Sequence, residues 1–138
     1  MDRITEDIYL GNLSDAGRSE WLRDGSPTAV LKLTAGDPAE SYPDAVVVRE
    51  VPLVDGPGND YADFEAAVGT MLDLLVDHTV FVHCRAGVSR SGAVTAAALA
   101  VRRDISVEEA VAFVRERRPM VRPHPHLRDQ AERFVEEY

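Results

Sequence analysis

Hydrophobic and polar positions follow two different periods along this chain of 138 residues. Short apolar or β-branched runs predict strands at residues 28–34, 45–54 and 79–82, and residues 4–10, which end at Gly11-Asn12, predict a further one. Apolar residues on one helical face predict helices at residues 61–76 and 125–137. Helices are also expected at residues 14–24 and 107–117, where capping residues flank the segment, and at residues 91–103, a run of small residues.

Capping and breaking residues mark where these elements begin and end. Ser14 is the expected N-cap of the first helix, and Gly25 is its expected C-cap. Ser106 followed by Glu109 has the spacing of a capping box ahead of residues 107–117. Pro52 cannot donate a backbone hydrogen bond, so the strand that contains it is expected at an edge of the sheet or at a point where the chain leaves it.

Strands that alternate with helices are typical of an α/β protein. We therefore expect a three-layer α/β/α sandwich around a central, mostly parallel sheet of four or five strands. The wholly apolar run at residues 79–82 is expected in the middle of that sheet, where both faces are covered. No linker divides the chain, so residues 1–138 are predicted to form one domain.

The stretch that follows the central strand carries the chemistry. The strand ends at His83-Cys84, and Arg90-Ser91-Gly92 then opens a helical run of small residues. Ligands bind α/β proteins at the carboxyl ends of the strands, and a loop that enters a helix N-terminus points its N–H groups at one place. Such a site also stabilises a thiolate and lowers a cysteine pKa from about 8.5 to roughly 3.5–7.5.

A phosphate ester fits this loop. Cys84 is positioned to attack phosphorus in line, and the Arg90 guanidinium is a planar fork for two phosphate oxygens. Ser91 can donate a hydrogen bond to the sulfur, and His83 can brace the loop through its ring nitrogens. A lone cysteine is more often a small buried apolar residue, but that interpretation does not explain the rest of the pattern. The phosphate-binding residues are predicted to be Arg85, Ala86, Gly87, Val88, Ser89 and Arg90.

The nine residues from His83 to Ser91, His-Cys-Arg-Ala-Gly-Val-Ser-Arg-Ser, resemble the signature loop of the cysteine-based protein tyrosine phosphatase superfamily, and most closely its dual-specificity branch. Residues 8–12, 51–55 and 117–130 also contain segments that are similar to that branch. The resemblance implies a phosphotyrosine phosphatase-like fold. It further implies hydrolysis of phosphotyrosine and phosphoserine/threonine in proteins through a phosphocysteine intermediate, with no cofactor.

A phosphatase also needs an acid that protonates the leaving oxygen. Asp55 is the first candidate, because it follows a strand on a Gly/Pro-rich loop at a position that resembles that of the family's general acid. We expect a mobile loop to bring it over the site. Asp60 is the second candidate and Asp63 the third, although Asp55 also suits a turn and Asp60 a helix N-cap.

Other charged residues near the site have simpler explanations. His124 and His126 lack the cysteine or carboxylate spacing of a metal site, so we expect no metal and interpret them as loop or rim residues. Arg118 follows a predicted helix, where a cation is favourable, and Arg122 lies in the Pro-rich loop beyond it. Either arginine could instead line the rim of the pocket.

The composition limits the classes of molecule that the protein is expected to bind. The net charge is −9, and Lys32 is the single lysine among 15 basic residues. This charge disfavours nucleic acid and anionic membranes as partners, and it suits either a salt-adapted organism or a GC-rich genome. One cysteine allows no internal disulfide, and we expect neither a signal peptide nor a membrane span from this sequence. We therefore expect a cytoplasmic monomer that acts on phosphorylated proteins.

Two other functions fit the motif less well. The first is hydrolysis of a non-protein phosphate ester, such as a phosphoinositide, a nucleotide or an RNA 5′-phosphate. Arg85 favours this function, because lipid-phosphate relatives often carry basic residues in the loop, whereas Val88 and the acidic composition disfavour it. The second is a non-catalytic phosphate-binding module, which would be expected to lack the cysteine, the arginine or the acid.

Overall fold

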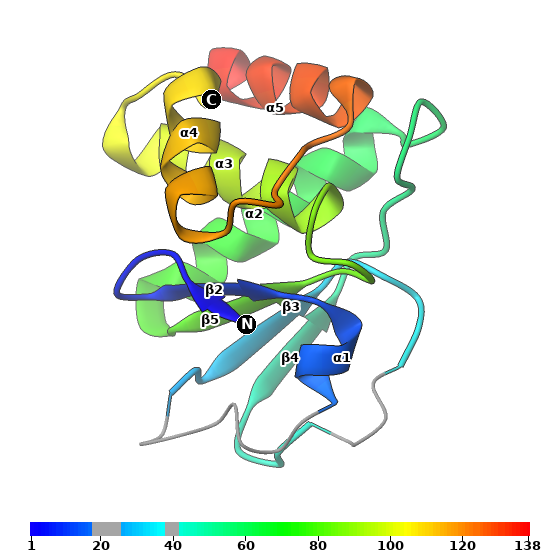
Figure 1. The fold of residues 1–138 in the computed structure, drawn as a ribbon, viewed down its shortest axis with the longest axis vertical. Coiled ribbons are helices and arrows are strands. Elements are labelled where there is room, and N and C mark those ends of the chain that lie inside the picture. The colour runs from blue at the N-terminus through cyan, green and yellow to red at the C-terminus, as the bar shows by residue number, and fades with distance from the viewer. Residues whose placement is uncertain (18–25, 38–41) are drawn as a thin grey trace.

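The computed structural model describes residues 1–17, 26–37 and 42–138. Five strands form one sheet, and helices lie on both of its faces (Figure 1). The strands are β1 (Asp2–Arg3), β2 (Ile8–Gly11), β3 (Ala29–Lys32), β4 (Val47–Glu50) and β5 (Val80–His83). The helices are α1 (Leu13–Ala16), α2 (Tyr61–Asp77), α3 (Arg90–Arg103), α4 (Val107–Arg117) and α5 (Pro125–Glu137).

The strand order is β1-β2-β5-β3-β4, so β5 lies in the middle as the sequence predicts. Strands β2, β5, β3 and β4 are parallel, and the short β1 pairs antiparallel with β2. In this register Gly11 and Lys32 are the partners of His83 on either side. The residues that follow β5 therefore emerge at the carboxyl edge of the sheet between two neighbouring strand ends.

Helices α2 to α5 cover one face of the sheet, and α1 lies on the other (Figure 1). The main core fills the space beneath the four longer helices, and a smaller cluster of Ala16, Val30 and Phe81 lies on the α1 face. Residues 91–100 of α3 are all buried, and their small side chains allow close packing. A Cβ at Gly92, for example, would lie 2.7 Å from Cγ1 of Val121. This packing holds the start of α3 in a fixed place over the end of β5.

The four longer helices closely match the predicted ranges. Ser106 caps α4 by accepting a 3.0 Å hydrogen bond from the backbone N–H of Glu109, as its spacing predicts. Asp60 occupies the N-cap position of α2, but its side chain makes no capping hydrogen bond. Among the described residues, no helix is long and apolar enough to cross a lipid bilayer.

Two predictions near the N-terminus are wrong. Residues 4–10 do not form one strand, because Ile4 N–H bonds to the Ile8 carbonyl at 2.8 Å and turns the chain between β1 and β2. The N-cap of α1 is Asn12 rather than Ser14, and Asn12 and Asp15 form a reciprocal capping box. The predicted C-cap Gly25 lies outside the described residues.

The strand predicted at residues 45–54 is shorter than expected. Strand β4 is an edge strand and ends at Glu50. Beyond it, Val51 and Leu53 still donate backbone hydrogen bonds of 2.9 and 3.0 Å to Lys32 and Leu33. Pro52 between them has no N–H, so the regular ladder stops while the chain remains attached to β3. This attachment fixes the point at which the chain leaves toward Asp55.

Candidate active site

Residues 84–91, here called the phosphate loop, connect β5 to α3 and curl around the Cys84 sulfur. The cysteine side chain is buried, with only 2% of the residue exposed. Its Sγ accepts a hydrogen bond from the Gly87 N–H at 3.3 Å and lies 3.2 Å from the Ser91 hydroxyl oxygen. Because α3 begins at Arg90, the positive end of its helix dipole also faces this region. The structure thus brings together the nucleophile and the hydroxyl donor that the sequence predicts.

Glycine is required at position 87 for two reasons. Its φ of 68° lies in the left-handed region, where a side chain is strained. A Cβ there would also collide with the Gly11 carbonyl group and approach Arg118 Nη2 at 2.8 Å. The tight turn at Gly87 is what directs its N–H toward the sulfur.

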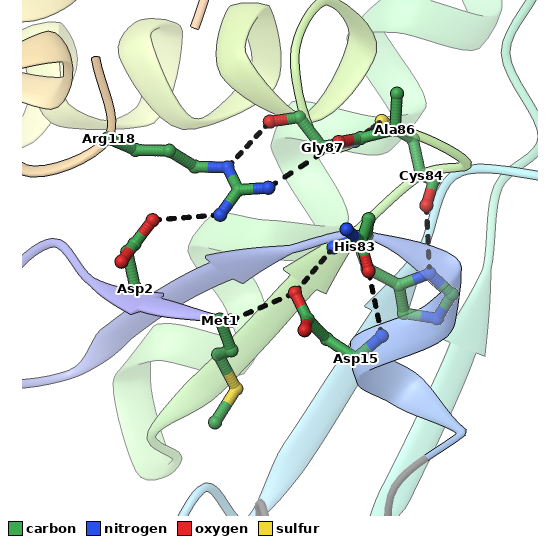
Figure 2. A network of polar contacts seen from close by, with 9 residues as sticks. Met1, Asp2, Asp15, His83, Cys84, Ala86, Gly87 and Arg118 are labelled. Atoms are coloured by element: carbon green, nitrogen blue, oxygen red, sulfur yellow. Dashed lines mark hydrogen bonds and ion pairs between the residues drawn. The ribbon is translucent and has the colours of Figure 1, made fainter. Parts of the chain in front are cut away.

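Arg118 braces the loop from behind, as Figure 2 shows. Its Nε donates to the Gly87 carbonyl at 2.8 Å, and its Nη2 donates to the Ala86 carbonyl at 3.4 Å. Its Nη1 forms a 2.8 Å ion pair with Asp2 Oδ2. These contacts hold the Ala86 and Gly87 carbonyl groups on the side of the loop that faces away from the sulfur. Arg118 is 5% exposed, so it is not a rim residue. The sequence could not reveal this brace, since no local pattern links residues 86 and 118.

His83, at the end of β5, contacts the phosphate loop through one ring nitrogen. Its Nδ1 lies 3.4 Å from the Cys84 carbonyl oxygen, and its Nε2 lies 2.6 Å from the hydroxyl of Tyr42. Burial lowers the pKa of His83 to about 4 and raises the pKa of Tyr42 to about 12, so both are neutral at neutral pH. One tautomer satisfies both contacts: Nδ1–H donates to the carbonyl, and Nε2 accepts from the tyrosine. Tyr42 is a partner that sequence reasoning missed.

Arg90, near the end of the phosphate loop, contacts the chain that leads to Asp55. Its Nη1 donates to the Leu53 carbonyl at 3.2 Å. Its Nε is buried and has no hydrogen-bond partner among the residues that the structure describes. A buried guanidinium N–H without a partner is costly, and a phosphate oxygen would satisfy it. The arrangement fits the predicted role of Arg90 in binding phosphate.

The structure separates the three candidate acids. Asp55 is exposed and lines a hollow beside the phosphate loop, here called the rim hollow. Asp60 instead lines a second hollow with Asp129 and Arg133 of α5, and Asp63 lies in the first turn of α2. Among these three, Asp55 shares a hollow with the phosphate loop. The rim hollow is lined by Asp55, Val88, Ser89, Arg122, Pro123, His124 and Pro125.

Three further residues that the sequence analysis singled out lie in or around the phosphate loop. Arg85 is exposed, and its backbone carbonyl accepts a 3.0 Å hydrogen bond from Leu13. Arg122 is exposed at the rim hollow, and its N–H donates to the Val88 carbonyl at 3.0 Å. The His124 N–H donates to the Ser89 hydroxyl at 2.8 Å, which joins the start of α5 to the phosphate loop. Within the described part of the chain, no group of three histidine, cysteine or acidic residues could hold a metal ion.

Comparison with known proteins places this site in a family. The profile described as "Dual specificity phosphatase, catalytic domain" matches residues 8–135. The chain belongs to the dual-specificity phosphatase family. Human dual specificity phosphatase 28 is 29% identical over 136 residues, which cover 97% of this chain and 77% of that protein. Human dual specificity protein phosphatase 14 is 32% identical over 131 residues, which cover 88% of this chain and 62% of that protein.

The fold agrees with this membership. The crystal structure of human DUSP28 has a TM-score of 0.87 and 27% sequence identity, and the match covers 99% of this chain and 96% of that one. The dual-specificity phosphatase described here is therefore a cysteine-based protein phosphatase. The predictions of family, fold and enzyme class are confirmed, and hydrolysis of a non-protein phosphate ester is not favoured.

Proposed function

We propose that this phosphatase hydrolyses phosphotyrosine and phosphoserine/threonine in proteins through a phosphocysteine on Cys84, with Asp55 as general acid. The observation that carries the proposal is the setting of the Cys84 sulfur, 3.3 Å from the Gly87 nitrogen and 3.2 Å from the Ser91 hydroxyl oxygen. N–H and O–H donors around a sulfur favour the thiolate, which is the nucleophilic form.

In the first step the Cys84 thiolate forms the S–P bond while the bond from phosphorus to the leaving oxygen breaks. Asp55 transfers its proton to that oxygen, so that tyrosine, serine or threonine leaves as a neutral alcohol. The Arg90 guanidinium and the N–H groups of residues 85–90 bind the three non-bridging oxygens, where negative charge gathers in the transition state.

In the second step a water molecule forms a new O–P bond while the S–P bond breaks. The water gives a proton to the Asp55 carboxylate, and inorganic phosphate is released. The Ser91 hydroxyl, 3.2 Å from Sγ, stabilises the thiolate as it leaves. This step restores the protonated acid and the free thiolate, so the cycle needs no cofactor.

The substrate is tested with wild-type protein on phosphotyrosine and phosphothreonine peptides and on a soluble phosphoinositide, with kcat/KM measured for each. We expect turnover of both peptides at a higher kcat/KM than the phosphoinositide. Cys84→Ser should abolish all three activities. A clear preference for the phosphoinositide, or activity that survives in Cys84→Ser, would overturn the proposal.

We further propose that the protein is a cytoplasmic monomer adapted to salt, and the acidic composition supports the salt adaptation. The net charge of −9 is carried with one lysine among 15 basic residues. At molar salt, repulsion between an acidic surface and a phosphorylated substrate is screened within about 3 Å. Sedimentation and activity measured from low to molar KCl test this. Activity that is constant or falls across the range would contradict salt adaptation.

A further inference from the structure

We propose that Asn59 and Gln130 are positioning residues that set where the Asp55 carboxyl group lies relative to the phosphate loop. The inference rests on the proposed role of Asp55 as general acid. It concerns residues 54–59, here called the acid loop, and the face of α5 that contacts it. Neither amide lies in the phosphate loop, and their effect on the reaction is transmitted through Asp55.

Hydrogen bonds within the acid loop close it on itself. The Asn59 side chain accepts a 2.8 Å hydrogen bond from the Val54 N–H through Oδ1. The Gly56 N–H donates to the Val54 carbonyl at 3.0 Å, and the Asn59 N–H donates to the Gly56 carbonyl at 3.2 Å. Asp55 is therefore held between Val54 and Gly56, which are hydrogen-bonded to each other.

A pair of amides then joins this closed loop to α5. The Asn59 Nδ2 donates to Gln130 Oε1 at 2.9 Å, and the Gln130 Nε2 donates to the Asn59 backbone carbonyl at 2.7 Å. His126 Nε2 lies 3.1 Å from the same carbonyl oxygen. Asn59 is 4% exposed and Gln130 is 6% exposed, so water cannot readily replace these bonds.

Helix α5 is also fixed to the phosphate loop at its other end. Its N-cap is His124, whose N–H donates to the Ser89 hydroxyl at 2.8 Å. Between His124 and Gln130 the chain is rigid helix. The helix thus sets the distance between the phosphate loop and the acid loop. The opposite end of the acid loop is held at Leu53, whose carbonyl accepts the 3.2 Å hydrogen bond from Arg90.

Packing alone does not explain an amide at position 130. Leu127, Ala131 and Phe134 lie on the same buried face of α5, where an apolar residue would meet the core without any polar atom to satisfy. The glutamine places its Oε1 against the Asn59 Nδ2 and its Nε2 against the Asn59 backbone carbonyl. The geometry is that of a specific contact with the acid loop.

Leaving-group dependence separates a positioning role from a merely structural one. A general acid is needed for phenyl phosphate, whose leaving oxygen is basic, and hardly for 2,4-dinitrophenyl phosphate, whose leaving anion is already stable. We therefore compare kcat/KM on the two substrates for wild type, Gln130→Met and Asp55→Asn, because kcat/KM reports formation of the S–P bond and not the later attack of water, in which Asp55 acts as base. Phe134→Leu is the matched control, because it weakens the packing of the same helix without touching the amide pair.

The expected result is that Gln130→Met lowers kcat/KM on phenyl phosphate by about 10- to 100-fold and on dinitrophenyl phosphate by less than about twofold. Phe134→Leu should change both substrates by the same small factor at a comparable loss of Tm. If Gln130→Met does not fold, Gln130→Glu replaces it. Glutamate keeps the acceptor for Asn59 Nδ2 and loses the donor to the Asn59 carbonyl, so the same selective loss is expected.

Two results would overturn different claims. If Asp55→Asn shows the selective loss and the Gln130 variants do not, the positioning role is wrong and the proposed function stands. If Asp55→Asn itself affects both substrates equally, the assignment of Asp55 as general acid is wrong. A double variant, Asn59→Asp with Gln130→Met, adds a second check. Its loss on phenyl phosphate should be no larger than that of the worse single variant, because both residues act through one contact. Losses that multiply would contradict the inference.

Discussion

The phosphate loop and the acid loop reach fixed positions by different means. In the phosphate loop, the Gly87 N–H faces the Cys84 sulfur, and Arg118 binds the Ala86 and Gly87 carbonyls on the other side. The acid loop is instead held in position by side-chain amides, because Asn59 closes the loop and Gln130 joins it to α5. The comparison teaches that the proposed nucleophile is placed by the local course of the chain and the proposed acid by a distant helix.

The largest loss of activity is expected from replacing Asp55, the proposed general acid of the acid loop. Asp55→Asn should lower kcat on phenyl phosphate by about 10²–10³-fold, because the leaving oxygen then receives no proton. Asp60→Asn is the control, because Asp60 lines the other hollow, and it should stay near wild type. A larger loss in Asp60→Asn would reverse the assignment of the acid.

Glycine substitutions sharpen the contrast between the two loops. Gly87→Ala should lower kcat/KM by about 10²-fold, because a Cβ at a φ of 68° strains the loop and strikes the Gly11 carbonyl group. Gly58→Ala in the acid loop should be nearly neutral, since its Cβ would make an ordinary 3.7 Å contact with Val54. Steady-state kinetics on phosphotyrosine peptide check both variants. Equal losses would mean that Gly87 is not special.

The brace behind the phosphate loop is expected to matter less. Arg118→Lys should lower kcat/KM by about tenfold, because an ammonium group cannot reach two carbonyls and Asp2 with the geometry of a guanidinium fork. Arg117→Lys is the matched control, since Arg117 is exposed and pairs with Glu116. The measurement is kcat/KM together with Tm. Unchanged kinetics in Arg118→Lys would show that the loop holds its shape without the brace.

The smallest effect concerns stability and pH. Burial lowers the pKa of His83 to about 4 in the folded protein, whereas an unfolded histidine titrates near 6.5. The unfolded chain then binds more protons between these values, so His83 removes stability as the pH falls from about 6.5 to about 4. Its share between pH 7 and pH 5.5 is about 1 kcal/mol. Urea unfolding at both pH values should show this loss in wild type and not in His83→Gln. An equal loss in both would contradict it.

The same comparison explains how much the sequence could predict. Cys84, Arg90 and Ser91 could be identified because strand, loop and helix follow one another within a short stretch, and each element has a local pattern. The fold class followed from the alternation of strands and helices. Asp55 was predicted to be the general acid from its loop and the family resemblance, and this assignment stays a prediction.

What could not be predicted depends on contacts between distant positions. The Asn59–Gln130 pair spans 71 residues, and the Tyr42–His83 contact spans 41. Only the folded sheet and the packing of α5 bring these side chains together. The turn at Ile4 and the cap at Asn12 were missed for a local reason. The boundaries of a strand or helix depend on single hydrogen bonds, and neighbouring residues in the sequence offer equally good candidates for them.

The central claim is that this phosphatase works through a covalent phosphate on Cys84. The most direct measurement is rapid acid quenching of Asp55→Asn during turnover of 2,4-dinitrophenyl phosphate, a substrate that does not need the acid for the first step. The protein is then digested and the peptides are analysed by mass spectrometry. We predict phosphate on the peptide that contains Cys84, and no adduct in Cys84→Ser. Turnover with no phosphorylated Cys84 peptide at any quench time, or turnover that persists in Cys84→Ser, would contradict the account.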